Sequence, residues 1–338
     1  MKLLLLLLLT TCCSAEEVFD AAEEAKYLSN IRQVTFQSMG FEKAGEAYFS
    51  PDEKTIVFQA VPTGEEQYQI FAMNLDEAIP RMVSTGRGAC TCAFFRPDGK
   101  KIIFASSHED PELDDPDFYQ DVPGYKRNGG NYSWAFTPYM NIYEANPDGS
   151  ELKALTHGPH YHAECAYSHD GKEIVFASNE SGTMNLYTMA SDGSNVQQVT
   201  NTDFCYNGGP FFSPDDSQIV FRADRHEEHM LQIYTITKDG LVEKQITSNA
   251  AVNWAPYWHP SGKYVAFTTS LHGHAHYEIY LVEVATGALS RVTHNRSFDG
   301  LPVFSNSGKK LLWTSKRGLD ASQIFIADFT LDSHIELK

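Results

Sequence analysis

Histidines gather in three short stretches of the chain, and histidine is the commonest metal ligand in proteins. The stretches are HGPHYHAE from His157, RHEEH from Arg225 and HGHAH from His272. Alternate residues of an extended strand share a face, so His272, His274 and His276 could converge on one metal ion. In a loop between strands the same histidines would simply face solvent. RHEEH does not match the HExxH motif of metalloproteases, whose histidines lie four residues apart.

A second group of polar residues stands at fixed distances before a recurring turn. The group comprises Glu46, His162, Glu164, Asn207, Asn253 and Asp299. If the segments that carry them surround one axis, these side chains gather at one mouth of a channel. Such a ring could bind a cation, a basic peptide or a polar ligand. Alternatively, the six side chains hydrogen-bond to one another in a water-filled channel.

The chain lacks the common catalytic motifs, since it has no GxSxG elbow, no P-loop and no dinucleotide fingerprint. We therefore name no catalytic residue. Glu46 with Glu164 could still act as a carboxylate pair if the fold sets them at a suitable separation. Enzyme activity is thus an alternative that the sequence leaves open.

The segments that must position these residues repeat six times. Each copy has a short apolar run, a polar tight turn and a second run rich in Ile, Val and Phe, which predicts a β-hairpin. The copies are AYFSPDEKTIVFQA from Ala47, CAFFRPDGKKIIFAS from Cys92, CAYSHDGKEIVFAS from Cys165, GPFFSPDDSQIVFRA from Gly209, APYWHPSGKYVAFTT from Ala255 and LPVFSNSGKKLLWTS from Leu301. The residues just before the turns are 46, 72, 45, 46 and 46 positions apart, which indicates a repeat architecture.

Two weaker strands complete each repeat, for example NLYTMA from Asn185 and QQVTN from Gln197. The sixth repeat has no fourth strand, but IRQVTF at residues 31–36 stands before the first copy and can supply it. These features predict an all-β fold, a closed six-bladed β-propeller of four-stranded blades over residues 31–338. Its N-terminal strand completes the last blade, and closure pairs the strand edges that an open array would expose.

The longest spacing predicts a loop insertion at about residues 107–137. Its first half is acidic, and its second half carries Tyr125, Arg127, Tyr132 and Trp134. Aromatic side chains beside charges suit a binding surface for a protein or a sugar. The alternative is a solvated acidic loop held by its aromatic residues. The acidic residues do not follow the EF-hand pattern for calcium.

The N-terminus, MKLLLLLLLTTCCSA, predicts a signal peptide over residues 1–15, with Lys2, a leucine run and a small-residue cleavage site. We expect a periplasmic or secreted protein, and no transmembrane segment once the signal is removed, because the apolar run is too short to span a bilayer. Lipid attachment at Cys12 or Cys13 is an alternative. Residues 16–30 predict a short helical lead-in.

The formal net charge of −18 argues against nucleic acid as a partner and favours cations or basic protein surfaces. Signal removal would leave Cys90, Cys92, Cys165 and Cys205. In an oxidising compartment these cysteines can form disulfides, or they can remain as buried thiols.

The repeats FFSPDDSQIVFRADR, AYSHDGKEIVFASN and LPVFSNSGKKLLWTSKRG, each followed by an IY or IF strand, resemble those of the TolB-like propeller family. The resemblance covers residues 31–329. It implies an exported bacterial propeller without a cofactor that contacts other proteins. TolB itself carries an α/β domain before the propeller, and we expect that domain to be missing here.

Taken with the charge, the resemblance predicts a non-catalytic protein-binding scaffold in the cell envelope, monomeric, with an envelope protein or peptide as its partner. The alternative is a polysaccharide lyase or hydrolase that uses the channel carboxylates and a histidine-bound metal. Oligogalacturonate lyase, another relative of the family, uses a histidine-bound metal on a similar propeller. Calcium or a transition metal would then be the cofactor.

Overall fold

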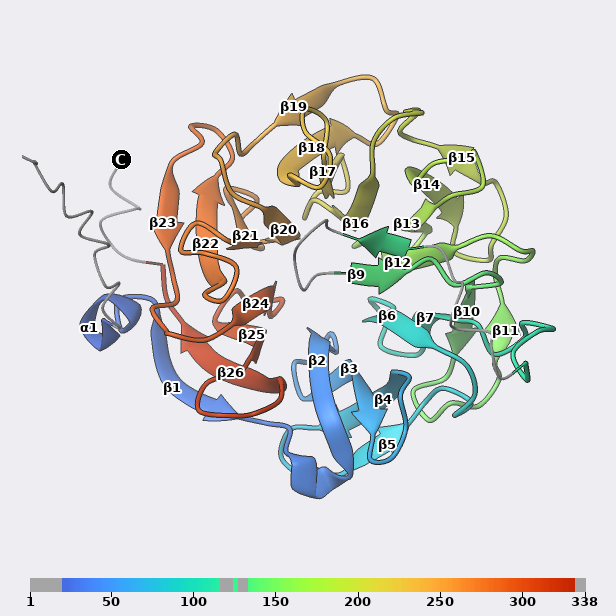
Figure 1. The fold of residues 1–338 in the computed structure, drawn as a ribbon, viewed down its shortest axis with the longest axis horizontal. Coiled ribbons are helices and arrows are strands. Elements are labelled where there is room, and N and C mark those ends of the chain that lie inside the picture. The colour runs from blue at the N-terminus through green and yellow to red at the C-terminus, as the bar shows by residue number, and fades with distance from the viewer. Residues whose placement is uncertain (1–19, 116–123, 127–132, 332–338) are drawn as a thin grey trace, which may run out of the picture.

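The computed structural model describes residues 20–115, 124–126 and 133–331 of the chain, with the backbone alone for 124–126 and 133–135. Figure 1 shows six sheets arranged in a ring around a central axis. Each sheet has four strands, and neighbouring strands within it run antiparallel. The predicted all-β fold, a six-bladed β-propeller, is confirmed.

The blades follow one another along the chain, and the first strand of each blade lies nearest the axis (Figure 1). Blade 1 has β2 (Phe41–Phe49), β3 (Thr55–Pro62), β4 (Gln69–Asn74) and β5 (Pro80–Met82); blade 2 has β6 (Cys90–Phe95), β7 (Ile102–Ser106), β10 (Asn141–Ala145) and β11 (Lys153–Ala154); blade 3 has β12 (His162–Tyr167), β13 (Glu173–Ser178), β14 (Asn185–Ala190) and β15 (Gln197–Gln198). Blade 4 has β16 (Asn207–Phe212), β17 (Gln218–Ala223), β18 (Gln232–Thr237) and β19 (Glu243–Gln245); blade 5 has β20 (Asn253–Trp258), β21 (Tyr264–Thr269), β22 (Glu278–Glu283) and β23 (Leu289–Arg291); blade 6 has β24 (Asp299–Phe304), β25 (Lys310–Ser315), β26 (Gln323–Phe329) and β1 (Leu28–Gln33).

The second strand of each blade forms the core between neighbouring sheets. Its central aromatic residue is at most 1% exposed in every blade: Phe58, Phe104, Phe176, Phe221, Phe267 and Trp313. Both faces of such a strand pack against protein, which explains why its apolar run is continuous and does not alternate with polar residues.

The N-terminal strand closes the ring. Strand β1 pairs antiparallel with β26, with Leu28 opposite Phe329. Just beyond β1, the Thr35 hydroxyl accepts a hydrogen bond of 2.9 Å from the backbone N–H of Ile324. In each of the other five blades, the Ser or Thr two residues after the fourth strand makes this bond within its own blade: Ser84, Thr156, Thr200, Thr247 and Thr293.

The lead-in segment is less helical than expected. Helix α1 covers only Ala21–Glu24, a 3-10 turn covers Gln37–Met39, and β1 starts before the expected Ile31. An ion-paired cluster fixes α1 to blade 6, because the Arg317 guanidinium donates to the carboxylates of both Glu24 and Asp299, at 2.7 Å each. The predicted signal peptide lies outside the described residues.

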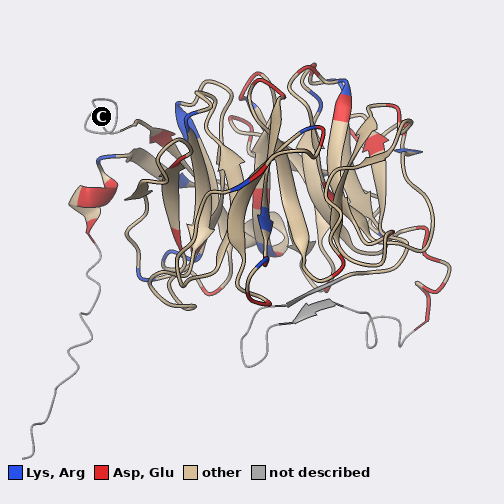
Figure 2. Ribbon diagram, turned by 90° about the horizontal axis from the view of Figure 1, so that it is seen from above, with Lys and Arg blue, Asp and Glu red and all other residues tan. Residues whose placement is uncertain are grey.

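The insertion leaves blade 2 between its second and third strands, β7 and β10. It contains a two-stranded ribbon, β8 (Gly124–Lys126) and β9 (Ser133–Ala135). Figure 2 shows the ring from the side, with most charged residues on the turns at its two faces. No helix among the described residues is long and apolar enough to cross a membrane.

Candidate functional site

A β-bulge in each first strand decides which side chains reach the central axis. We count back from the residue just before each hairpin turn, which is residue 50, 96, 168, 213, 259 or 305. The fourth residue before it has a positive φ, between 47° and 59°, and the pairing with the second strand shifts there. The bulge breaks the alternation of side chains between the two faces of the strand. The six bulge residues all line one central cavity: Glu46, Cys92, Glu164, Gly209, Ala255 and Leu301.

The central cavity has a volume of about 390 Å³. Two residues after the bulges, aromatic rings from four blades form its floor, with neighbouring centroids 4.9 to 6.2 Å apart: Tyr48, Phe94, Phe211 and Tyr257. On the other side of this floor the hollow is only about 30 Å³. The floor therefore closes the channel toward the face that carries the hairpin turns.

The cavity opens toward the other face, where first strands begin and second strands end, which we call the mouth face. Loop residues of that face line the cavity, including Gln67, Tyr68 and Tyr161. The described end of the insertion joins them, because Thr137 and Met140 also line the cavity. The long insertion thus contributes to the wall of the site.

Glu164 is held by a cluster of donors on blade 4. Its Oε1 atom accepts hydrogen bonds from the Tyr206 hydroxyl at 2.8 Å and from Arg222 Nη2 at 3.1 Å. Its Oε2 atom accepts one from the backbone N–H of Gly209. The side chains of Glu164 and Arg222 are only 7% and 12% exposed, so the pair sits largely out of water. Its charges are matched, which a buried pair requires.

Glu46 has no such cation. Within the described part of the chain it forms no ion pair, and the Tyr48 hydroxyl donates a hydrogen bond of 3.2 Å to its Oε1 atom. Burial is the main cause that raises the pKa of Glu46, and the charge of Glu164 adds to it. Hydrogen bonding from Cys92 and Tyr48 and the charge of Arg222 act in the opposite direction.

The thiols near Glu46 are poor nucleophiles. Cys92 lies at the bulge of β6, and the Cys165 thiol contacts its carbonyl oxygen at 3.5 Å. Burial and the neighbouring carboxylates raise the pKa of Cys92 well above its usual range, which keeps the thiol protonated. The four described cysteines are free, so no disulfide links them.

Of the six predicted channel residues, only Glu46 and Glu164 line the cavity. Asn207 and Asn253 are fully buried and donate to the third-strand amides Asn185 and Gln232. The bulge brings the fourth residue before the turn to the axis, while Asn207 and Asn253, six residues before it, tie the first strand of their own blade to the third strand of the preceding blade. This division of roles is the physical reason why the cavity is lined by fewer of the predicted channel residues than expected.

The other two predicted channel residues also lie away from the cavity. Asp299 is 0% exposed and binds Arg317 and the indole N–H of Trp313. His162 is 3% exposed, and burial lowers its pKa to about 4, so it stays neutral at ordinary pH. A role of these four residues in ligand binding stays a prediction.

The histidines of the HGHAH stretch make separate contacts. His272 lies 2.6 Å from the Tyr280 hydroxyl, His274 lies 3.0 Å from the Tyr277 hydroxyl, and His276 lies 2.7 Å from the Arg296 carbonyl oxygen. In the described ranges no group of three His, Cys, Asp or Glu residues is placed to hold a metal ion. The stretch is thus arranged as a hydrogen-bonded loop.

The predicted loop surface is only partly described. Tyr125 and Trp134 face each other in the register of β8 and β9, whereas Arg127 and Tyr132 lie outside the described residues. Beyond the ribbon, Phe136 packs its ring 5.3 Å from Tyr161 and 6.3 Å from Tyr206. The C-terminal end of the insertion therefore rests on the wall of the central cavity.

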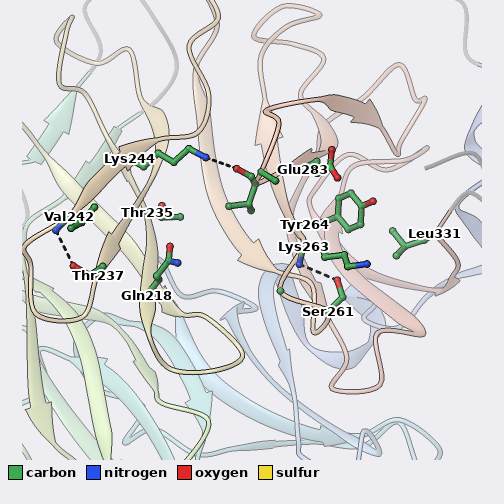
Figure 3. Close-up of a pocket in the computed structure, with 13 residues that line it drawn as sticks. Gln218, Thr235, Thr237, Val242, Lys244, Ser261, Lys263, Tyr264, Glu283 and Leu331 are labelled. Atoms are coloured by element: carbon green, nitrogen blue, oxygen red, sulfur yellow. Dashed lines mark hydrogen bonds between the residues drawn. The ribbon is translucent and has the colours of Figure 1, made fainter. Parts of the chain in front are cut away.

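A larger hollow of about 890 Å³ lies between blades 4 and 5. Figure 3 shows Lys244 at this hollow with a dashed line from its ammonium group. The acceptor is the Val284 carbonyl oxygen, at 2.7 Å. Lys153 makes the same kind of bond to Asp192 between blades 2 and 3. This hollow is thus part of a seam that recurs between blades, which points to a role in the scaffold.

Sequence reasoning missed Arg222, Tyr206 and the aromatic floor. The floor had a signal in the repeats, because an aromatic residue recurs two positions before the turn in four copies. Arg222 had a weaker one, since it replaces the small residue that follows the aromatic core residue in most other copies. The bulges themselves have no sequence pattern that would predict them.

No family model matches this chain. Dipeptidyl-peptidase 5 of Porphyromonas endodontalis is 27% identical over 128 residues, which are 38% of this chain and 15% of that protein. The Tol-Pal system protein TolB of Francisella tularensis subsp. tularensis is 31% identical over 84 residues, 25% of this chain and 19% of that protein. The matched part therefore spans less than a fifth of either relative.

Solved structures match over most of the chain. A structure described as TolB from Agrobacterium tumefaciens superposes with a TM-score of 0.59 and 18% identity, over 89% of this chain and 97% of that one. Oligogalacturonate lyase in complex with manganese gives a TM-score of 0.52 and 13% identity, over 89% and 93%. At these identities the likeness concerns the fold, and it confirms the resemblance to TolB-like propellers at that level.

Proposed function

We propose that this protein is a non-catalytic binding scaffold of the cell envelope that takes a protein partner on its mouth face. The observation that carries the proposal is the central cavity, which has one mouth, a closed aromatic floor and a carboxylate, Glu46, without a cationic partner in the described residues. Concave sites with aromatic walls and a few oriented polar groups are typical of binding sites.

The setting of the cavity supports a protein partner. Loops of a rigid propeller are well suited to present a binding surface, and the insertion adds aromatic Phe136 beside the cavity wall. Phe204, in the loop that enters β16 on this face, is 73% exposed. An exposed aromatic residue on the face where a cavity opens is the type of residue that anchors protein interfaces.

The envelope location has two supports. The first is the export signal that residues 1–15 predict. The second is the likeness to TolB, which the curated relative's name places in the Tol-Pal system. We accordingly propose a periplasmic or secreted monomer whose partner is an envelope protein or peptide. In the alternative, the exported protein is anchored by a lipid attached at Cys12 or Cys13.

A matched pair of variants tests the mouth face. Phe204→Ser removes the exposed aromatic residue there, and Leu241→Ser removes an equally exposed apolar residue, 80% exposed, from the opposite face of the same blade. We expect a partner recovered from envelope extract to be lost with Phe204→Ser and kept with Leu241→Ser, as quantified by mass spectrometry. Equal recovery with both variants, or loss with Leu241→Ser alone, would contradict the proposal.

A polysaccharide lyase or hydrolase is the second candidate, favoured by the superposition on oligogalacturonate lyase in complex with manganese. In this candidate the channel carboxylates and a histidine-bound metal would carry the chemistry. Metal analysis of the purified protein separates the two functions. Stoichiometric manganese, zinc or calcium that is lost in His162→Ala or His274→Ala would support the lyase or hydrolase.

A further inference from the structure

The carboxylate of Glu46 is the group in the central cavity whose charge is left uncompensated. Two carboxylates line the cavity, Glu46 and Glu164, against one guanidinium, Arg222. Arg222 bonds to Glu164 and to the Tyr206 hydroxyl. Glu46 keeps part of its surface exposed inside the cavity, so a ligand can reach it. A cation placed there would complete the pairing that a buried charge requires.

The walls around Glu46 suit a cation on an apolar stem. Tyr48 and Tyr257 belong to the floor, while Tyr68, Tyr161 and Trp254 line the cavity nearer to its mouth. Faces of Tyr and Trp rings attract cations and also pack well against methylene groups. The rim already accepts such a group, because the ammonium of Lys43 lies 4.8 Å from the ring centroid of Tyr68.

The loops of the mouth face add a negative field. Exposed carboxylates occur on the loops after the second strands of four blades: Glu65, Glu66, Glu112, Asp114, Asp115, Glu180, Glu227 and Glu228. Arg87, in a neighbouring loop, is already paired with Asp114 at 2.9 Å. A negatively charged surface raises the local concentration and the association rate of cationic partners.

From these observations we propose that the central cavity binds the basic side chain, lysine or arginine, of a protein partner. The cationic head pairs with the Glu46 carboxylate just above the aromatic floor. The methylene stem lies between Tyr68, Tyr161 and Trp254, and the partner backbone stays at the mouth. This inference rests on the proposed function only for the claim that the cation belongs to a protein.

Binding of the cation is linked to a proton on Glu46. The groups that act most strongly on this carboxyl are Tyr48 on its own strand, Cys92 on β6, Glu164 on β12 and Arg222 on β17. The ionisable groups of Tyr68, Tyr161 and Cys165 also lie near enough to interact with its charge. Since burial and Glu164 raise the pKa of Glu46, the carboxyl holds its proton to a higher pH than a free glutamate does. A cation requires the ionised form, so its affinity increases as the pH rises.

Titration calorimetry with small probes tests this proposal directly. The probes are Nα-acetyl-lysine-N-methylamide, the corresponding arginine diamide, and the uncharged analogue Nα-acetyl-norleucine-N-methylamide, which keeps the four-carbon stem but lacks the ammonium group. We expect the norleucine probe to bind the wild-type protein about tenfold more weakly, or worse, than a basic probe. Glu46→Gln should weaken the basic probes by a similar factor, whereas Glu77→Gln, in the exposed turn between β4 and β5 on the opposite face of the same blade, should change little.

The wild-type comparison alone can overturn the proposal, so it does not depend on whether Glu46→Gln folds. Equal binding of lysine and norleucine probes, or no binding of any basic probe, would refute the cationic site. Tighter binding of free 1,5-diaminopentane than of the lysine diamide would assign the cavity to small polyamines and refute a protein source. The Phe204→Ser experiment stays separate, because a mouth-face partner can be real even if no basic probe binds.

Discussion

At the scale of single residues, one buried carboxyl stands where the other blades carry an amide. Glu278 begins the third strand of blade 5 and is 0% exposed. Its counterparts in the other blades are Gln69, Asn141, Asn185, Gln232 and Gln323. Glu278 accepts hydrogen bonds from Arg291 at 3.0 Å and from the backbone of Asn295 at 2.8 Å. Burial nevertheless raises its pKa to about 8.

This shift predicts a pH-dependent stability. The folded protein binds a proton on Glu278 that the unfolded chain, with a pKa near 4.5, has released, so stability falls as the pH rises toward 8. The slope is at most about 1.4 kcal/mol per pH unit. In Glu278→Gln this contribution should vanish. Urea unfolding at pH 5.5, 6.5 and 7.5 measures it.

Gln232→Glu supplies the matched control for that measurement. It places a carboxyl at the same position of blade 4, where the amide now donates to the Ala251 carbonyl at 2.8 Å. We expect this variant to acquire the loss of stability with rising pH that Glu278→Gln abolishes. If wild type and Glu278→Gln show parallel pH profiles, Glu278 is ionised in the folded protein and the assignment fails.

At the scale of elements, the bulge of the first strand is the feature that builds the site. All six bulge residues share a positive φ, yet only Gly209 is a glycine. The reason lies in its surroundings, since a Cβ atom on Gly209 would lie 2.1 Å from Arg222 Nη1. Ala255 occupies the same place in blade 5 with φ 50°, so the backbone geometry alone does not demand glycine.

Gly209→Ala should therefore displace Arg222 from Glu164. The expected cost is about 3 kcal/mol of unfolding free energy, because Glu164 would be left as a buried charge without its partner. Ala255→Gly is the control and should change the unfolding free energy little, because the added freedom of the unfolded chain is offset by relief of the positive φ at this position. Urea unfolding compares them. Equal losses in the two variants would show that Arg222 adapts to the added methyl group.

At the scale of the whole molecule, the ring depends on bonds between the two ends of the chain. Thr35 and Thr200 make the same hydrogen bond to the start of a third strand, at 2.9 Å and 2.8 Å. The Thr200 bond joins neighbouring parts of one blade, whereas the Thr35 bond joins residues 289 positions apart. The ion-paired cluster of Glu24, Arg317 and Asp299 fastens the same closure.

Valine substitutions separate the role of Thr35 in closing the ring from the role of Thr200 within a single blade. Thr35→Val and Thr200→Val should each cost about 1–3 kcal/mol, since each leaves a buried N–H unsatisfied. Only Thr35→Val should increase amide hydrogen exchange in β1 and β26, because it loosens the closure locally. Hydrogen exchange with mass spectrometry resolves the difference. Uniform exchange changes in both variants would mean that the ring opens only on global unfolding.

The sequence by itself determined the propeller, its six blades and the exchange of a strand between its ends. Apolar runs, tight turns and their spacing are local properties, and local pairing rules translate them into blades. Even the Val-Thr pair of residues 34–35 marked the closing strand, because each of the other five blades has an apolar residue followed by Ser or Thr at the corresponding position.

The tertiary structure alone decided which side chains form the site. Alternation along an ideal strand treats Glu46 and Asp299 alike, since both precede the turn by an even number of residues. The bulge then turns Glu46 toward the axis, while Asp299 binds Arg317 of its own blade and, through it, Glu24 of α1. Bulges and ion clusters arise from packing between blades, so residues distant in the chain set them and no local pattern encodes them.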